Sequence, residues 1–174
     1  MSKIDFSPFE QGTYYPVLLE VGADVNAKDA AGLTALDLGC LNGHDNVIPM
    51  LVESGADVNA KDDQGETALH TGCWAGCAGL IPVLIEAGAD VNAKNDYGQT
   101  PLHCGCQNGH SNVIQTLVDL GCDLNGNIQY LLVQIALADN ASRRAGAQAA
   151  LEDIAFEDFA EIHELLDFLF LSEI

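Results

Sequence analysis

The sequence is poor in basic residues. Only 6 of its 174 residues are Lys or Arg, against 26 Asp and Glu, so the formal net charge is −20 at pH 7. A protein that binds a nucleic-acid backbone needs a basic surface, and so does a protein that docks on anionic lipid. The scarcity of positive charge argues against both kinds of partner. The charge leaves two alternatives: a basic partner, or no partner whose binding depends on charge.

Long apolar runs are also missing. No stretch reaches the ~18 apolar residues of a membrane span. Residues 1–9 lack the apolar run of a signal peptide. We therefore expect a cytoplasmic protein whose six cysteines are reduced. Apolar residues still make up 48% of the chain, so we expect one folded domain rather than disorder.

Sequence motifs of catalysis and metal binding are absent as well. There is no P-loop, no G-x-G-x-x-G and no G-x-S-x-G. Residues 163–167 nearly match the zinc-protease motif H-E-x-x-H, but Asp167 replaces the second histidine and no third ligand is evident. Residues 57–61 begin like a calcium loop but place Lys61 at a ligand position. We therefore predict no catalytic residue, no metal and no cofactor.

What the sequence has instead is a repeat with a period of 33 residues. Three segments start with threonine at this spacing: TALDLGCLNGH from Thr34, TALHTGCWAGC from Thr67 and TPLHCGCQNGH from Thr100. The segment GADVNAKD, or a close variant, precedes each of them, at 22–29, 55–62 and 88–95. Asparagine keeps the same spacing, at Asn26, Asn59, Asn92 and Asn125.

This pattern resembles the ankyrin repeat, whose hallmark is a TPLH-type segment after GADVNAKD at this period. The resemblance covers residues 11–125 and implies an all-α solenoid of stacked ankyrin repeats, each a helix-turn-helix with a hairpin loop. We divide the single domain into an N-terminal capping unit at 1–21, three full repeats at 22–125, and a C-terminal part at 126–174. The C-terminal part is predicted to be a degenerate cap with an acidic helical extension.

The physical chemistry of each unit agrees with this architecture. The three threonines are good N-caps, and the glycines at 43, 76 and 109 suit left-handed C-caps. A second helix in each unit then carries an apolar stripe with the spacing i, i+1, i+4, i+5. The stripes are Val47, Ile48, Leu51 and Val52; Leu80, Ile81, Leu84 and Ile85; and Val113, Ile114, Leu117 and Val118. One unit cannot bury its stripe alone, so the units must stack.

The predicted C-terminal helix at 156–174 has two interpretations. From Ala145 onward the chain has eight acidic residues and no Lys or Arg. The apolar stripe of the helix consists of Phe159, Ile162, Leu166, Leu169 and Phe170. The helix either closes the open end of the stack or forms a second interface, for a homodimer or for another protein.

Three cysteines and three glycines recur within the first helices. Cys40, Cys73 and Cys106 share one repeat position, and stacked helices lie about 8–10 Å apart. Sulfurs that share a zinc ion lie within about 4 Å of each other, so cysteines on successive helices are too far apart to bind one zinc ion. We therefore predict that the three cysteines are buried thiols. Cys77 and Cys122 are candidates for reactive surface thiols.

The three recurring glycines directly precede the recurring cysteines; they are Gly39, Gly72 and Gly105. They indicate either very close packing of the first helices or simple duplication of one ancestral repeat.

The resemblance also assigns a role to two histidines. His70 and His103 occupy the TPLH-type segments, and the family's pattern implies that they form hydrogen bonds within the repeat framework. Asp37 takes this position in the first repeat, so the local network there must differ.

The resemblance implies that a partner contacts the loop tips and the exposed sides of the first helices. These are also the positions at which the three copies differ most. The predicted partner-binding residues are Leu33, Leu41, Asp63, Gln64, Glu66, Thr71, Trp74, Asp96, Tyr97, Gln99, Gln107 and Asn108. Trp74 and Tyr97 are the best candidates, because aromatic anchors supply much of the energy of an interface. The alternative for Trp74 is packing against a neighbouring repeat.

Acidic residues at the tips would surround these anchors. Asp63, Glu66 and Asp96 are predicted to form an acidic rim, while the recurring lysines at 28, 61 and 94 belong to the framework. We therefore predict a non-catalytic adaptor or assembly protein that binds a partner protein. The alternative is an acidic inhibitor or immunity protein that sequesters a basic enzyme such as a nuclease toxin, with the variant that it mimics the charge of nucleic acid.

Overall fold

The computed structural model describes residues 22–123. The predicted N-terminal cap at 1–21 lies outside the described residues, and so does the predicted C-terminal part at 126–174 with its stripe at 159–170. The boundaries of these two regions and the second interface therefore stay predictions.

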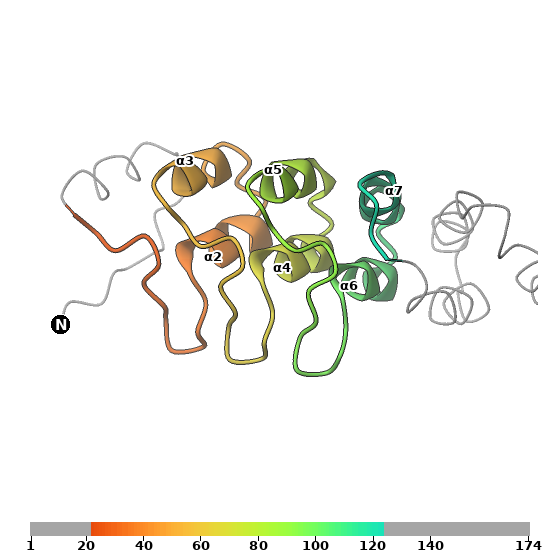
Figure 1. Ribbon diagram of the computed structural model, residues 1–174, viewed down its shortest axis with the longest axis horizontal. Coiled ribbons are helices and arrows are strands. Elements are labelled where there is room, and N and C mark those ends of the chain that lie inside the picture. The colour runs from red at the N-terminus through yellow and green to blue at the C-terminus, as the bar shows by residue number, and fades with distance from the viewer. Residues whose placement is uncertain (1–21, 124–174) are drawn as a thin grey trace, which may run out of the picture.

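Residues 22–123 form three pairs of short helices. The first helices of the pairs are α2 (Ala35–Leu41), α4 (Ala68–Ala75) and α6 (Pro101–Asn108). The second helices are α3 (Ile48–Glu53), α5 (Ile81–Glu86) and α7 (Ser111–Asp119), and a 3₁₀ turn, η1 (Ala78–Leu80), leads into α5. No strand occurs in this part of the chain. The first helices lie side by side in one layer and the second helices in another, as Figure 1 shows. The predicted all-α solenoid is confirmed.

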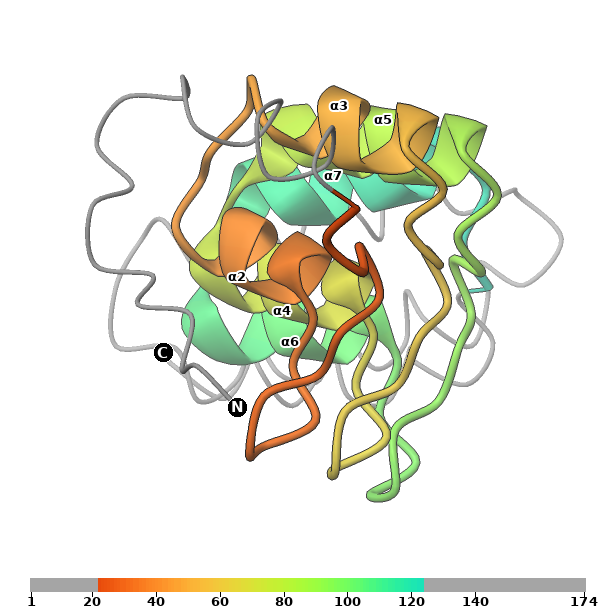
Figure 2. The ribbon, with the colours of Figure 1, turned by 90° about the vertical axis from the view of Figure 1, so that its left-hand side faces the viewer.

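Figure 2 views the same stack along its length. The loops between repeats project from the first-helix layer, on the side away from α3, α5 and α7 (Figures 1 and 2). Each loop is tied as a tight hairpin by two main-chain hydrogen bonds. In the second loop, Asp62 N donates to the Glu66 carbonyl at 2.9 Å and Gly65 N donates to the Asp62 carbonyl at 3.1 Å. The predicted loop or hairpin is therefore present.

Each first helix begins with the predicted threonine cap. Thr34, Thr67 and Thr100 have extended backbones and form capping boxes with the residue three positions later. In the second repeat the Thr67 N–H donates to Nδ1 of His70 at 3.2 Å. Since Nδ1 accepts, Nε2 carries the ring proton and donates to the Gln99 carbonyl of the next repeat at 3.1 Å. The expected framework role of His70 is confirmed.

Asp37 forms a different network, as the sequence suggested. Its Oδ2 accepts from the main-chain N–H and from the hydroxyl of Thr34, both at 2.7 Å. A carboxylate has no hydrogen-bond donor, so Asp37 caps its helix without the donated bond to the next repeat that His70 provides. The side chain is buried, and this burial raises the pKa of Asp37. Burial also disfavours the charged form of His70, and because that form is the protonated one, the pKa of His70 is lowered.

The predicted apolar stripes form the core between the two helix layers. In each second helix three of the four stripe residues are buried; they are Val47, Ile48 and Leu51, then Leu80, Ile81 and Leu84, then Val113, Ile114 and Leu117. The fourth residue of each stripe is partly buried against this cluster. The helical period of the sequence therefore predicted which face of each second helix turns inward.

The glycines of the first helices pack in two different ways. A β-carbon at Gly39 would lie 2.7 Å from Cδ1 of Ile48, and one at Gly105 would lie 2.9 Å from Cγ1 of Val113. Glycine at both positions therefore permits close approach of a side chain from the second helix of the same repeat. At Gly72 the nearest neighbour is Cβ of Cys40 at 3.7 Å, an ordinary contact. Of the two interpretations of the recurring glycines, close packing therefore fits Gly39 and Gly105, and simple duplication fits Gly72.

Hydrogen bonds between the loops hold the repeats in register. Asn59 donates from Nδ2 to the Gly88 carbonyl at 2.9 Å and accepts from Asp90 N at 2.8 Å. Asn26 makes the corresponding pair of bonds with the second repeat. The ammonium groups of the lysines reach one repeat further along, since Lys61 donates to the Lys94 carbonyl at 2.8 Å. We call these recurring residues the stacking framework: Asn26, Asn59, Asn92, Lys28 and Lys61.

The thiols of the described residues are not activated. Cys40, Cys73 and Cys106 are free and buried, as predicted. Cys122 is only 8% exposed, and burial raises the pKa of its thiol to about 11. The prediction of a reactive surface thiol at Cys122 is therefore wrong, because the residue packs into the end of the core. Cys77 is half-buried, and its pKa is also raised by burial, which disfavours the nucleophilic thiolate.

Candidate protein-binding groove

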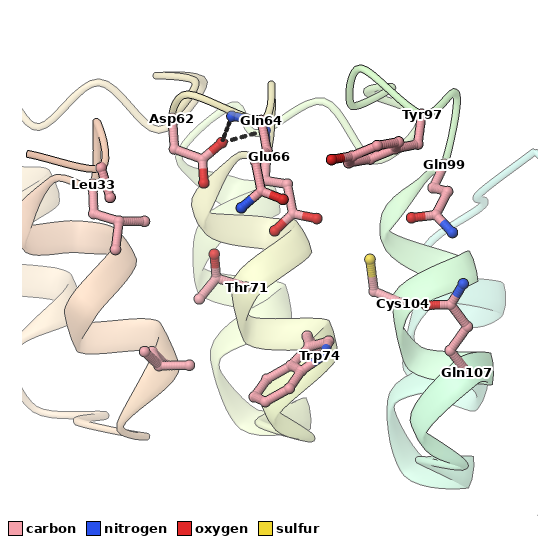
Figure 3. A pocket seen from close by; sticks show the side chains of 12 residues that line it. Leu33, Asp62, Gln64, Glu66, Thr71, Trp74, Tyr97, Gln99, Cys104 and Gln107 are labelled. Atoms are coloured by element: carbon pink, nitrogen blue, oxygen red, sulfur yellow. Dashed lines mark hydrogen bonds between the residues drawn. The ribbon is translucent and has the colours of Figure 1, made fainter.

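A groove of about 490 Å³ lies between the loops and the exposed sides of the first helices. Its lining comes from three successive repeats, as Figure 3 shows. The residues that line this groove are Ala31, Leu33, Leu41, Asp62, Gln64, Glu66, Thr71, Trp74, Tyr97, Gln99, Cys104 and Gln107. Because no single repeat supplies the groove, it exists only in the stacked solenoid.

The floor of the groove is made of small buried side chains. Thr71 on α4 is buried, and its hydroxyl donates to the Thr67 carbonyl of its own helix at 3.4 Å. Cys104 on α6 is also buried, and burial raises the pKa of its thiol to about 12. The floor therefore offers shape and apolar contact rather than a reactive group.

Large exposed side chains stand above this floor. Trp74 on α4 is 54% exposed and Tyr97, on the loop before α6, is 70% exposed. Leu41 at the end of α2 is exposed as well. Among the described residues, only the main chain of Trp74 contacts a neighbouring repeat through a hydrogen bond. The Trp74 carbonyl accepts from Nε2 of His110 at 3.0 Å, while the ring lines the groove.

The loop side of the groove is acidic. Oδ1 of Asp62 accepts from the N–H groups of Gln64 and Glu66, both at 2.8 Å, and so fixes the shape of this loop (Figure 3). Oε1 of Glu66 accepts from Nδ2 of Asn95 at 3.2 Å. No Lys, Arg or His is among the described residues that line the groove. Asp62 and Glu66 are therefore the charged side chains of the lining.

The structure brings most of the predicted partner-binding residues into this groove. Nine of them line it: Leu33, Leu41, Gln64, Glu66, Thr71, Trp74, Tyr97, Gln99 and Gln107. Asn108 does not, because its Nδ2 turns back to donate to the Cys104 carbonyl at 3.0 Å. Sequence spacing placed Asn108 on the right helix but could not show this local hydrogen bond.

Asp63 and Asp96 also lie outside the groove. Each sits at a loop tip, where its N–H donates to the preceding loop: Asp63 N to the Ala31 carbonyl at 3.2 Å, and Asp96 N to the Gln64 carbonyl at 3.0 Å. Their carboxylates lie against the glycines of those loops, Gly32 and Gly65. Of the three residues predicted to form an acidic rim, only Glu66 therefore lines the groove.

Asp62 lines the groove although sequence reasoning did not select it. It ends the recurring segment at 55–62 and therefore looked like a framework residue. The signal that could have identified it is its counterpart in the third repeat, Asn95, since the change from Asp to Asn shows that the position varies in charge.

Comparison with known families agrees with the repeat pattern. Residues 18–71 match a family described as ankyrin repeats (many copies), and residues 61–128 match one described as ankyrin repeats (3 copies). The chain belongs to the ankyrin-repeat family. Ankyrin repeats are generally protein–protein interaction modules, and members of the family are typically not catalysts. No curated protein gives a significant match to the chain.

Residues 22–123 contain neither a membrane-spanning helix nor a cluster of metal ligands. None of their helices is long and apolar enough to cross a membrane. Within the same range, His, Cys, Asp and Glu side chains do not gather in a group of three or more that could hold a metal ion.

Proposed function

We propose that this protein is a cytoplasmic, non-catalytic adaptor or assembly factor that holds a segment of a partner protein in the groove. The observation that carries the proposal is the pair of exposed aromatic side chains, Trp74 and Tyr97, above a buried floor. Exposed aromatic residues around a concave surface are typical of protein-binding sites, because their burial on binding releases a large apolar area.

The groups that could perform chemistry support binding rather than catalysis. The Cys104 thiol, which lines the groove, has a raised pKa and stays protonated near neutral pH. His70 uses both ring nitrogens in the framework, one toward Thr67 and one toward Gln99. Neither side chain is therefore free to act as a nucleophile or as a general base.

The test is affinity capture from cell extract with the full chain and with Trp74→Ala. We expect Trp74→Ala to weaken capture of the partner by about tenfold or more, since a central aromatic anchor contributes about 2 kcal/mol. Leu120→Ala is the matched control, because Leu120 is an exposed apolar residue that does not line the groove. Equal capture by the wild type and Trp74→Ala, with both proteins folded, would remove the groove from the proposal.

The acidity of the chain supports a second candidate, an inhibitor that covers a basic enzyme. The described residues carry fourteen Asp and Glu against three Lys, and Lys28 and Lys61 donate to main-chain carbonyls. Opposite charge speeds association, and salt weakens it. Repeating the capture at low and high salt distinguishes the two. A basic partner that is lost as salt rises favours the inhibitor, and a partner retained at high salt favours the adaptor.

A further inference from the structure

The groove has two chemically different ends. At the loop end, the ring of Tyr97 extends toward Gln64 and Glu66, as Figure 3 shows. At the other end, Trp74 lies further along α4, and Leu41 at the end of α2 also lines the groove. A ligand that fills both ends must therefore carry a group suited to an aromatic ring beside carboxylates and, next to it, an apolar group.

The loop end is built to receive positive charge. Only Oε1 of Glu66 has a hydrogen-bond partner among the described residues, Nδ2 of Asn95, so Oε2 is available to a ligand. Asp62 likewise uses Oδ1 for the loop and leaves Oδ2 available. The loop N–H groups hold the Asp62 carboxylate, and Nδ2 of Asn95 holds the Glu66 carboxylate, before a ligand arrives, which lowers the entropy lost on binding. The exposed face of Tyr97 adds the quadrupole that attracts cations.

We propose that the groove recognises an arginine side chain in an extended segment of the partner protein, an inference that rests on the proposed function. The guanidinium group lies against the Tyr97 ring and donates to Glu66. A neighbouring apolar side chain of the same segment packs on Trp74 and Leu41.

The geometry favours arginine over lysine. A guanidinium group is planar, so it stacks on an aromatic ring while its N–H groups point outward in the plane of the group. Three side chains that line the loop end carry acceptor oxygens: the carboxylates of Asp62 and Glu66 and the amide of Gln64. A lysine ammonium group is compact and strongly hydrated, so it would have to choose between the ring and the carboxylates.

The test begins with selection of peptides from a random displayed library on the full chain. We expect the selected peptides to be enriched in arginine with an apolar residue nearby. A synthetic selected peptide in which citrulline replaces the arginine keeps the shape but loses the charge, and we expect it to bind about tenfold more weakly. Lysine in the same place should also weaken binding, because the stacking is lost.

Variants of the chain then assign the contacts. Glu66→Gln and Tyr97→Ala should each weaken the selected peptide by about tenfold. Tyr97→Phe should keep most of the affinity, since it keeps the ring. Glu86→Gln is the matched control for charge, because Glu86 is exposed at the end of α5 and does not line the groove.

The outcomes separate this inference from the proposed function. Peptides that lack arginine, ignore Glu66→Gln and still depend on Trp74 overturn the arginine inference and leave the protein-binding groove standing. Peptides that bind Trp74→Ala and Tyr97→Ala as well as the wild type overturn both. Selection of no binding peptide at all overturns recognition of an extended segment, while the capture experiment still tests the groove.

Discussion

Asn59 and Trp74 belong to the same repeat but serve different surfaces. Asn59, whose counterparts at 26 and 92 are also Asn, joins its repeat to the next with two hydrogen bonds. Trp74, whose counterparts are Leu41 and Gln107, leaves its ring exposed in the groove. Residues that recur with the period therefore hold the stack together, and residues that vary within it shape the groove. A stacking contact must be made again at every junction, whereas the groove is formed once.

This comparison predicts that framework and groove variants separate stability from binding. Leu84→Ala should have the largest effect on stability, since Leu84 is fully buried in the core. We expect the free energy of unfolding to fall by about 2–5 kcal/mol, because the change removes apolar contact and leaves a cavity. Urea denaturation measures this loss. If the folded fraction of the variant also lost affinity for a selected peptide, the separation between core and groove would be wrong.

Asn59→Ala tests the stacking framework itself. The change removes the two bonds that the Asn59 side chain forms with the third repeat and leaves the Gly88 carbonyl and Asp90 N–H to water. We expect a loss of about 1–2 kcal/mol in the free energy of unfolding. Gln107→Ala is the control, because Gln107 is an exposed residue of the groove that belongs to no framework bond. Similar losses in both variants would contradict the division of roles.

Asp37→Asn should give the smallest change, and one that depends on pH. Burial raises the pKa of Asp37 above its ordinary value of 3.8, so the buried charge weakens the fold at neutral pH. As pH falls through the raised pKa toward 3.8, the folded protein takes up the proton first and this penalty disappears. The wild type should therefore gain stability relative to Asp37→Asn over that interval. The measurement is urea denaturation of both proteins across pH, and a difference that stays constant would refute the prediction.

Local chemistry made much of the solenoid predictable from the sequence. Threonine caps, glycine C-caps and the stripe at i, i+1, i+4, i+5 each depend on residues within one or two helical turns. The structure places Thr67, Gly76 and Leu84 in the roles that this reasoning gave them. Contacts between elements were harder to anticipate. Gly39 and Gly72 share a repeat position, yet only Gly39 has a second-helix side chain against it.

The sequence predicted which residues belong to the candidate site better than it predicted how their side chains are directed. The resemblance to ankyrin repeats, carried over by repeat position, placed Trp74, Tyr97 and Glu66 on one surface. It could not show that Asn108 turns back onto its own helix or that Asp63 joins the preceding loop. Those side-chain directions depend on which neighbouring carbonyl or amide each group reaches, and that is a property of the folded neighbours.

The sequence by itself determined the repeat, the helices and the inward face of each second helix, because these follow from spacing along one chain. Tertiary structure alone decided which acidic groups line the groove together with the aromatic rings. Asp62 and Glu66 line the groove. The carboxylates of Asp63 and Asp96 instead lie against the loop of the preceding repeat. The physical reason is that each loop forms hydrogen bonds with its neighbour, so the direction of a carboxylate in one repeat depends on the backbone of another.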